Sequence, residues 1–263
     1  MATFNSRAKR VAQAALVLGA WLAAAGFAAA GETGTNVFAA RAAAEFHRAQ
    51  SQFQSHTNDA TAAWEFARAC FNFADFVSND TDHAVIARQG IAASRQAIAC
   101  EPNSAPGHYY LGENLGQLAR TETLGALKIV KEMEREFKTA ARRDGHFDYA
   151  GAERSLGLLY RDAPGWPVSI GSQHKAREWL EQAAKLEPGY PENHLNLAES
   201  YFQWHERGEA SRELSALDAL WPTARTNLIG PAWEPSWADW STRRDMVRKQ
   251  LDENSKPAGA PKN

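Results

Sequence analysis

Residues 191–220 decide the fold of this chain, and they read PENHLNLAESYFQWHERGEASRELSALDAL. The ring-bearing residue His194 is followed at helical spacing by Leu197, Ala198 and Tyr201. After a turn at 207–208, a second apolar series follows at Ala210, Leu214 and Leu217. Small residues let two antiparallel helices approach closely, and large residues fill the groove beside them. This stretch therefore predicts a helical hairpin.

The same spacing recurs three times upstream, with insertions between the two halves of a unit. The units carry Leu156, Gly157 and Tyr160 with Ala176, Leu180, Ala183 and Pro188; Leu111, Gly112 and Leu115 with Phe137 and Ala140; and Trp64 and Phe71 with Ala97 and Pro102. This is the spacing of the tetratricopeptide repeat (TPR) signature. We therefore expect an all-α fold, a TPR-like helical-hairpin solenoid with four degenerate repeats over residues 59–222.

Solenoid ends expose an apolar face, so a capping helix is expected at each end of the repeats. The N-terminal helix is predicted within residues 31–58, from about Phe38 to Gln54. The C-terminal helix is predicted from about Ser236 to Leu251, after a linker within 223–235. The linker contains Gly230 and two prolines, which predict an irregular backbone. Residues 253–263 are expected to form a disordered tail.

The first thirty residues have the layout of a secretory signal peptide. Arg7, Lys9 and Arg10 precede a charge-free, alanine-rich run over residues 11–30. We expect cleavage near Gly31 and a periplasmic protein, and the alternative is an uncleaved anchor, because about 20 apolar residues can span a bilayer. A lipid anchor is not expected, since no cysteine precedes Cys70.

Charge and cysteine placement exclude further classes of protein. The chain has 29 basic and 31 acidic residues, and removal of the signal peptide leaves 26 basic ones, so no nucleic-acid partner is expected. Cys70 and Cys100 lie at different distances from the turn predicted at 79–82. At 1.5 Å per residue this mismatch is roughly 13 Å, beyond the reach of a disulfide. Both thiols are expected to be free and buried.

The concave face of the solenoid is the candidate binding surface. In each first helix, the residues one and five places after the aromatic position should point into it. By this count the groove residues are Glu65, Tyr109, Glu113, Arg154, Leu158, Leu195 and Glu199, with Arg161 and Gln203 near the edge and Trp166 on the adjacent loop 163–172. Arg154 could hold a ligand carboxylate through two hydrogen bonds. The alternatives are that Arg154 pairs with Glu113 or Glu199, and that the charges are solvated surface.

Catalytic and metal-binding patterns are not found, and neither an enzyme nor a cofactor is expected. Asp144, His146 and Asp148 are better explained as a polar connector than as metal ligands. His108 and His194 occupy packing positions of the repeat. Four tryptophans, Trp221, Trp233, Trp237 and Trp240, could form an aromatic ligand box or an oligomer contact, but packing of the capping segment is the preferred interpretation.

Several stretches resemble one family of TPR proteins. These stretches are RSLGLLY at 154–160, APG at 163–165, the helix at 175–183, and PENHLNLAE at 191–199. Together they resemble the TPR-containing T component of TRAP-type transporters (TatT-like). The resemblance implies a periplasmic, all-helical and often trimeric protein that engages a substrate-binding transport subunit, although the lipobox cysteine is missing. The alternative is a cell-envelope interaction scaffold without a link to transport, and in either case the partner is a protein or a small polar ligand.

Overall fold

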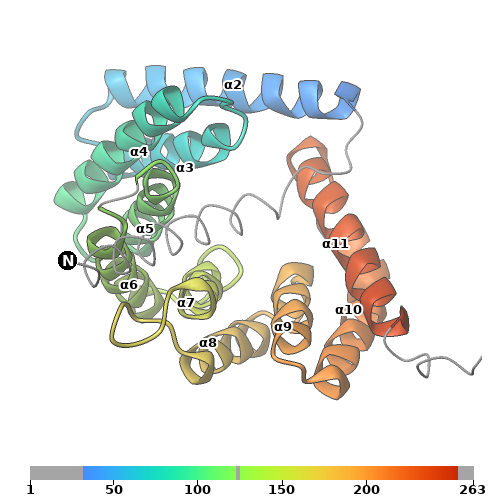
Figure 1. Ribbon diagram of the computed structural model, residues 1–263. Coiled ribbons are helices and arrows are strands. Elements are labelled where there is room, and N and C mark those ends of the chain that lie inside the picture. The colour runs from blue at the N-terminus through green and yellow to red at the C-terminus, as the bar shows by residue number, and fades with distance from the viewer. Residues whose placement is uncertain (1–31, 123–124, 254–263) are drawn as a thin grey trace, which may run out of the picture.

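The computed structural model describes residues 32–122 and 125–253, and this part of the chain is all-α (Figure 1). The predicted signal peptide and most of the predicted tail lie outside the described residues. The ten helices are α2 (Glu32–Ser55), α3 (Ala60–Ala74), α4 (Asp80–Cys100), α5 (Ala105–Ala119), α6 (Ala126–Arg143), α7 (Gly151–Asp162), α8 (Gln173–Leu186), α9 (Pro191–Gln203), α10 (Arg207–Asn227) and α11 (Glu234–Glu253). The helices up to α10 pack mainly on their neighbours in sequence, whereas α11 packs mainly on α9, so the predicted fold of sequential helical hairpins is confirmed.

Small residues allow the two helices of each hairpin to touch, as the repeat pattern predicts. A Cβ atom added to Gly157 of α7 would lie 2.5 Å from Leu180 Cγ of α8. A Cβ atom added to Gly112 of α5 would lie 2.4 Å from Phe137 Cε1 of α6. Both distances are shorter than van der Waals contact, so these positions require glycine at the observed helix separation.

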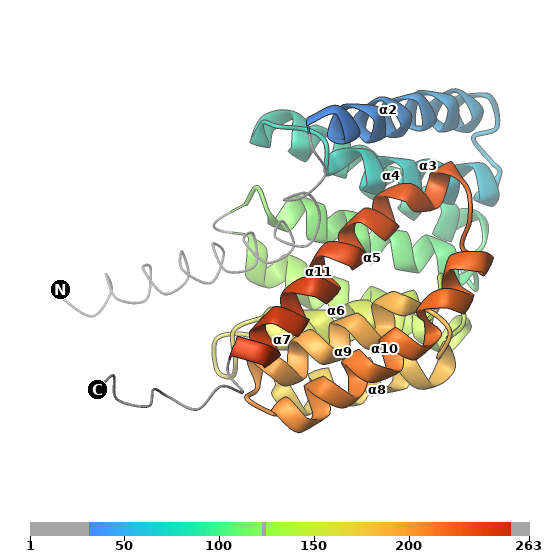
Figure 2. The same ribbon diagram turned by 90° about the vertical axis from the view of Figure 1, so that its right-hand side faces the viewer.

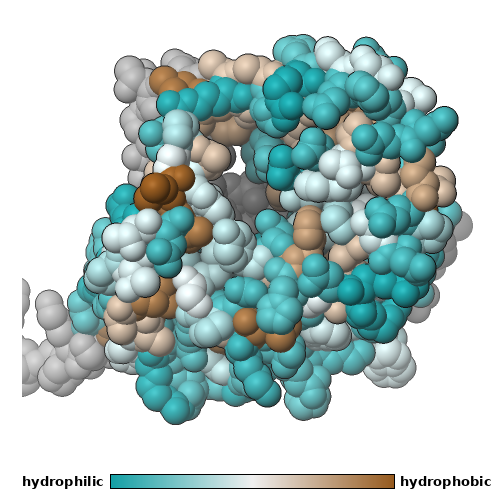
Figure 3. All heavy atoms as spheres, turned by 180° about the vertical axis from the view of Figure 1, so that it is seen from behind, coloured by the Kyte–Doolittle hydropathy of each residue, from teal (hydrophilic) through white to brown (hydrophobic). Residues whose placement is uncertain are grey.

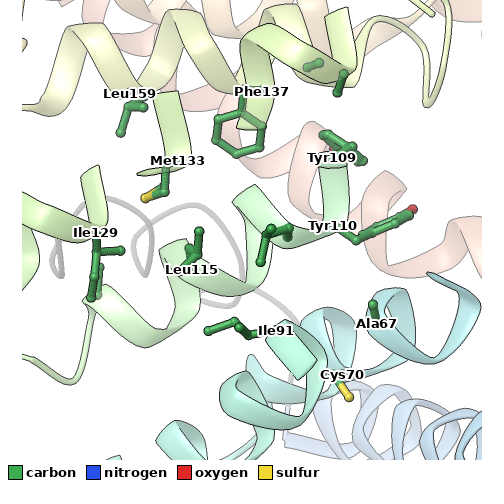
Figure 4. Close-up of a cluster of buried hydrophobic side chains, with 14 of the residues drawn as sticks. Ala67, Cys70, Ile91, Tyr109, Tyr110, Leu115, Ile129, Met133, Phe137 and Leu159 are labelled. Carbon is green, nitrogen blue, oxygen red and sulfur yellow. The ribbon is translucent and has the colours of Figure 1, made fainter. Parts of the chain in front are cut away.

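A continuous apolar core joins the hairpins from α3 to α7. Figure 4 shows Cys70 and Ile91 on one side of it, Leu115 and Met133 in the middle, and Leu159 at the far end. A second cluster joins α9, α10 and α11 around the buried Trp237 and Trp240. These tryptophans therefore pack the capping helix, while Trp221 and Trp233 are partly buried against the same cluster.

The hairpins follow an arc, and α11 returns across its open side. The first helices α3, α5, α7 and α9 lie on the inner side of the arc, and α4, α6, α8 and α10 lie outside (Figure 1). Figure 2 shows α11 running diagonally from the α2 end of the molecule to the α8–α10 end. At the α2 end, Arg41 of α2 pairs with Glu234 at the start of α11 and donates a hydrogen bond to the carbonyl of Pro231 at 3.4 Å. The molecule is consequently hollowed at its centre (Figure 3).

Two expectations are wrong, namely the irregular backbone predicted from residue 223 and the burial of Cys100. Residues 223–227 are not an irregular linker, because α10 continues through Pro222 to Asn227 and buries Ala224 under the capping helix. The connection to α11 is only residues 228–233, and α11 extends to Glu253. Cys70 and Cys100 are both free, but Cys100 is exposed rather than buried because it ends α4.

No helix in the described part of the chain combines the length and the apolar character needed to cross a bilayer.

Replacement of Gly157 by alanine tests the helix contact. We expect Gly157→Ala to lower the free energy of unfolding by about 1 to 3 kcal/mol, because the added methyl group overlaps Leu180. The control is Gly208→Ala in α10, where an added Cβ meets nothing within 4 Å. This control should be neutral or stabilise the protein by up to about 1 kcal/mol. Equal denaturation midpoints of Gly157→Ala and wild type would show that α7 and α8 do not touch at this residue.

Candidate binding site on the inner face

A pocket of about 120 Å³ opens on the inner face, between the first helices of three consecutive hairpins. Its lining comes from α3, α5 and α7, with two side chains of α6 beneath them. The lining residues are Phe71, Asp75, Glu113, Gly116, Gln117, Arg120, Met133, Phe137, Ser155, Leu158, Leu159 and Asp162. One water needs roughly 10 to 15 Å³, so the pocket has room for about ten waters or for one long side chain.

Glu113 is one of three acids that line this pocket, with Asp75 and Asp162. Ser155 of α7 donates a hydrogen bond to its carboxylate. Burial raises the pKa of Glu113 to about 7, against the opposing effects of the Ser155 hydrogen bond and of the Arg154 charge. At the other end of the pocket Arg120 donates to Asp75 Oδ1 at 3.0 Å and to Gln117 Oε1 at 2.9 Å. The charges of that end are therefore paired, whereas Glu113 forms no ion pair with any residue in the ranges 32–122 and 125–253.

Arg154 does not reach the pocket, because its guanidinium is buried between the α6–α7 connector and α9. Its Nη1 donates to the carbonyl of Tyr149 at 3.1 Å and to Asn193 Oδ1 at 3.2 Å. Its ion-pair partners are Asp148 at 3.4 Å and Glu192 at 3.8 Å. These acids differ from Glu113 and Glu199, the partners considered from the sequence. The donors of Arg154 are thus directed at groups of the protein itself.

The backbone next to Arg154 explains why an arginine is buried there. Asp148, Tyr149 and Ala150 have φ values of 52°, 56° and 59°, so three consecutive non-glycine residues adopt the left-handed conformation. This conformation costs roughly 1 to 3 kcal/mol per residue unless its surroundings hold it in place. The hydrogen bonds from Arg154 and from Asn193 Nδ2 (3.2 Å) to the Tyr149 carbonyl hold it.

Three of the four residues one place after the aromatic position are buried, namely Tyr109, Arg154 and Leu195, contrary to the expectation that they face the groove. Tyr109 is 4% exposed, and its hydroxyl donates to Asp148 Oδ2 at 2.8 Å. Leu195 is completely buried in the cluster that α9 forms with α11. The α6–α7 connector covers Tyr109 and Arg154, and α11 covers Leu195. The periodicity of one helix carries no information about such covering segments.

The other predicted groove residues divide between the pocket and its surroundings. Glu113 and Leu158 line the pocket. Glu199 lies beside α11 and binds Arg243, while Arg161 pairs with Asp162 and donates to Ser200 Oγ at 3.1 Å. Glu65 is half-buried on α3, and Gln203 is exposed at the end of α9. Trp166 is 89% exposed on the α7–α8 loop and does not line the pocket.

The sequence pattern missed most of the pocket lining. Gly116, Gln117 and Arg120 lie eight to twelve places after the aromatic position of α5, beyond the two positions that were counted. Met133 and Phe137 come from a second helix, which was not expected on this face. The spacing counted on the first helices carries no signal for these residues.

The histidines and the candidate metal ligands have protein partners. His108 and His194 are largely buried. The Nδ1 atom of His108 is hydrogen-bonded to Glu136, and that of His194 is hydrogen-bonded to Glu213. His146 contacts Glu187 at 2.7 Å, whereas Asp148 faces Arg154. Among the described residues, the histidine, cysteine and acidic side chains form no group of three that could hold a metal ion.

Comparison with solved structures places the arrangement among TPR folds. TTC0263, a thermophilic TPR protein of Thermus thermophilus, is similar with a TM-score of 0.59 and 18% identity, over 80% of this chain and 92% of that one. Two crystal structures of MamA give TM-scores of 0.48 and 0.47 at 14% and 13% identity, over 68% and 71% of this chain and 87% and 86% of theirs. No family model and no curated protein matches the chain. The likeness to TTC0263 establishes the TPR-like fold.

Replacement of Arg154 tests its role in holding the α6–α7 connector. We expect Arg154→Met to lower the free energy of unfolding by about 3 to 5 kcal/mol, because it removes a buried guanidinium and leaves two half-buried acids and the left-handed turn without their partner. The control is Arg95→Met, which removes an exposed ion pair with Glu132 and should cost less than about 1 kcal/mol. Chemical denaturation of both variants measures the difference. Similar losses in the two variants would contradict this role.

The pH dependence of stability tests the burial of Glu113. Its folded-state pKa of about 7 exceeds its reference value of 4.5, so the folded protein binds a proton more tightly and loses stability as the pH rises between these values. Glu113→Gln removes this loss. We expect the variant to exceed wild type by on the order of 1 to 3 kcal/mol at pH 8 and to match it near pH 4.

The control for this experiment is Glu178→Gln, because Glu178 is an exposed carboxylate on α8. Its stability profile should follow that of wild type from pH 4 to pH 8. Parallel profiles for wild type and Glu113→Gln would show that the Glu113 carboxylate titrates normally.

Proposed function

We propose that this protein is an exported TPR scaffold whose inner face binds a protein partner at the pocket around Glu113. The observation that carries this proposal is the difference between two parts of the same face. Over α9 the inner face is covered by α11, whereas over α5 and α7 it holds an open pocket. A TPR-like solenoid presents an extended concave surface of the kind that binds other chains.

The chemistry of the pocket favours recognition over catalysis. Glu113 accepts a hydrogen bond from Ser155, and its other surroundings are apolar side chains or carboxylates that are paired with arginines. The pocket offers shape, apolar walls and one carboxylate that has no ion-pair partner among the described residues, and these are the properties of a binding site. A shifted pKa also occurs in catalytic sites, but no second proton-transferring side chain contacts Glu113 among the described residues.

The resemblance to the T component of TRAP-type transporters supports a more specific proposal. The partner would then be the periplasmic substrate-binding subunit of such a transporter. The loop that follows α7 belongs to the resemblance, and it presents Trp166 with 89% of its surface exposed. Tryptophan is frequent in interfaces, so this loop is the proposed second contact, either with the partner or between copies of this chain. An envelope scaffold without a transport link remains the second candidate.

Site-directed photo-crosslinking tests the proposal in the native host. A photoreactive phenylalanine analogue at Leu158 should produce a protein adduct of defined mass in the periplasmic fraction. The same analogue at Glu178 of α8 is the control and should produce none. Adducts at position 166 would show that the loop takes part, and mass spectrometry of the adducts distinguishes a substrate-binding subunit, a second copy of this chain and another envelope protein.

Two results would overturn this proposal. Recovery of the protein in the cytoplasm would contradict export. Equal yields of adducts at positions 158 and 178, or no adduct at 158, would contradict binding at the inner face.

A further inference from the structure

The hairpins α5–α6 and α9–α10 repeat the same polar contacts at equivalent positions. In the first, His108 Nδ1 lies 2.7 Å from Glu136 and its Nε2 lies 3.3 Å from the Pro102 carbonyl. In the second, His194 Nδ1 lies 2.8 Å from Glu213 and its Nε2 lies 3.0 Å from the Pro188 carbonyl. Each histidine therefore links its own helix to the next helix and to the preceding turn. This match fixes the register between the two hairpins.

In this register Glu113 of α5 corresponds to Glu199 of α9, since each lies five residues after its histidine. The carboxylate of Glu199 is paired with a cation of the same chain. Arg243 of α11 donates to its two oxygens from Nε at 2.8 Å and from Nη2 at 2.7 Å. Burial raises the pKa of Glu199, but the charge and hydrogen bonds of Arg243 hold it below the usual range. The capping helix thus acts as an internal ligand that delivers a guanidinium to the inner face.

Glu113 has the same place in the fold without such a cation among the described residues. The α11 helix packs on α9 and α10 rather than on α5, so the space above Glu113 is the open pocket. Phe71, Phe137 and Leu158 supply its apolar walls. These walls suit the aliphatic stem of a long side chain, because such stems pack on apolar surface while the charged end reaches a polar group.

The charges around Glu113 also favour a cation. Its electrostatic neighbours include the acids Asp148 and Glu192 and the cation Arg154. Arg154 is already engaged with both of those acids. At the pocket wall, Asp75 is paired with Arg120 and Asp162 is paired with Arg161. The charges within each pair therefore cancel. The carboxylate of Glu113 is left as the excess charge, and an incoming guanidinium would neutralise it.

We propose that the pocket between α3, α5 and α7 binds an arginine side chain of the partner protein, which forms a bidentate ion pair with Glu113 as Arg243 does with Glu199. The arginine stem lies against Phe71, Phe137 and Leu158. This inference rests on the proposed function, which makes a partner protein the source of the arginine. Free arginine carries the same guanidinium and is the other ligand that the experiment distinguishes. The site differs from the one at Glu199, because there Arg243 of the same chain already supplies the guanidinium.

Isothermal titration with matched peptides tests the inference on the full chain. The probes are Gly-Gly-Arg-Gly-Gly, the same peptide with neutral citrulline in place of arginine, and free arginine amide. We expect the arginine peptide to bind, and the citrulline peptide to bind roughly tenfold more weakly or not at all, as the loss of a charged hydrogen-bond pair predicts. Arginine amide that binds as tightly as the peptide would identify a small-molecule site.

Substitution of Glu113, with Glu178 as the control, tests whether the peptide binds in the pocket. Glu113→Gln should weaken the arginine peptide roughly tenfold or more, whereas Glu178→Gln should leave its affinity unchanged. In wild type the affinity should rise from pH 6 to pH 8, because the pKa of Glu113 is about 7 and the ion pair requires its ionised form. The pH dependence should disappear in Glu113→Gln, even though Asp148, Glu192, Asp75 and Asp162 remain nearby.

Equal affinities for the arginine and citrulline peptides, or for wild type and Glu113→Gln, would overturn the arginine site. Photo-crosslinking at position 158 is independent of this result. If adducts form while the peptides fail, the scaffold function stands and the arginine inference is wrong. If the arginine peptide binds while no adduct forms, the pocket recognises a guanidinium but the proposed protein scaffold is wrong.

Discussion

The buried guanidinium of Arg154 is the interaction on which the arrangement of the repeats depends. It holds the left-handed turn at 148–150 through the Tyr149 carbonyl and contacts Asn193 of the next hairpin. The same turn positions Asp148 to accept the hydroxyl of Tyr109 from the preceding hairpin. One side chain thereby connects α5, α7 and α9. Because its donors are used inside the protein, Arg154 sets the spacing of the inner face and leaves recognition to other residues.

The capping helix divides the inner face into an occupied part and an open part. Over α9, Trp237 and Trp240 bury the apolar surface and Arg243 neutralises Glu199. Over α5 and α7, the open pocket leaves the apolar walls and Glu113 accessible. The contact of α11 with α2 through Arg41 and Glu234 is exposed, so it contributes little to stability. The aromatic cluster of α9, α10 and α11 is what keeps the capping helix in place.

Local patterns in the sequence were sufficient for the fold. Helical periodicity and the small residues Gly157 and Ala198 mark the contacts within hairpins, and such contacts involve residues close together in the chain. The same information failed for the connections. Gly230 and the two prolines within 223–235 predicted an irregular linker, but α10 continues through Pro222, and burial of Ala224 against α11 extends it by another turn. Tertiary packing outweighs the local preference of proline there.

Residue spacing along the chain is enough to predict the all-α repeat architecture and to place Glu113 and Leu158 on the inner face. Which of the inner residues are accessible follows from the tertiary fold, because exposure depends on segments far along the chain. The connector at 144–150 covers Tyr109 and Arg154, and α11 covers Leu195. Two equivalent acids consequently differ in character: Glu199 is neutralised by α11, while Glu113 faces an open pocket. Helical spacing repeats every few residues, but the covering segments occur once each and leave no periodic signal.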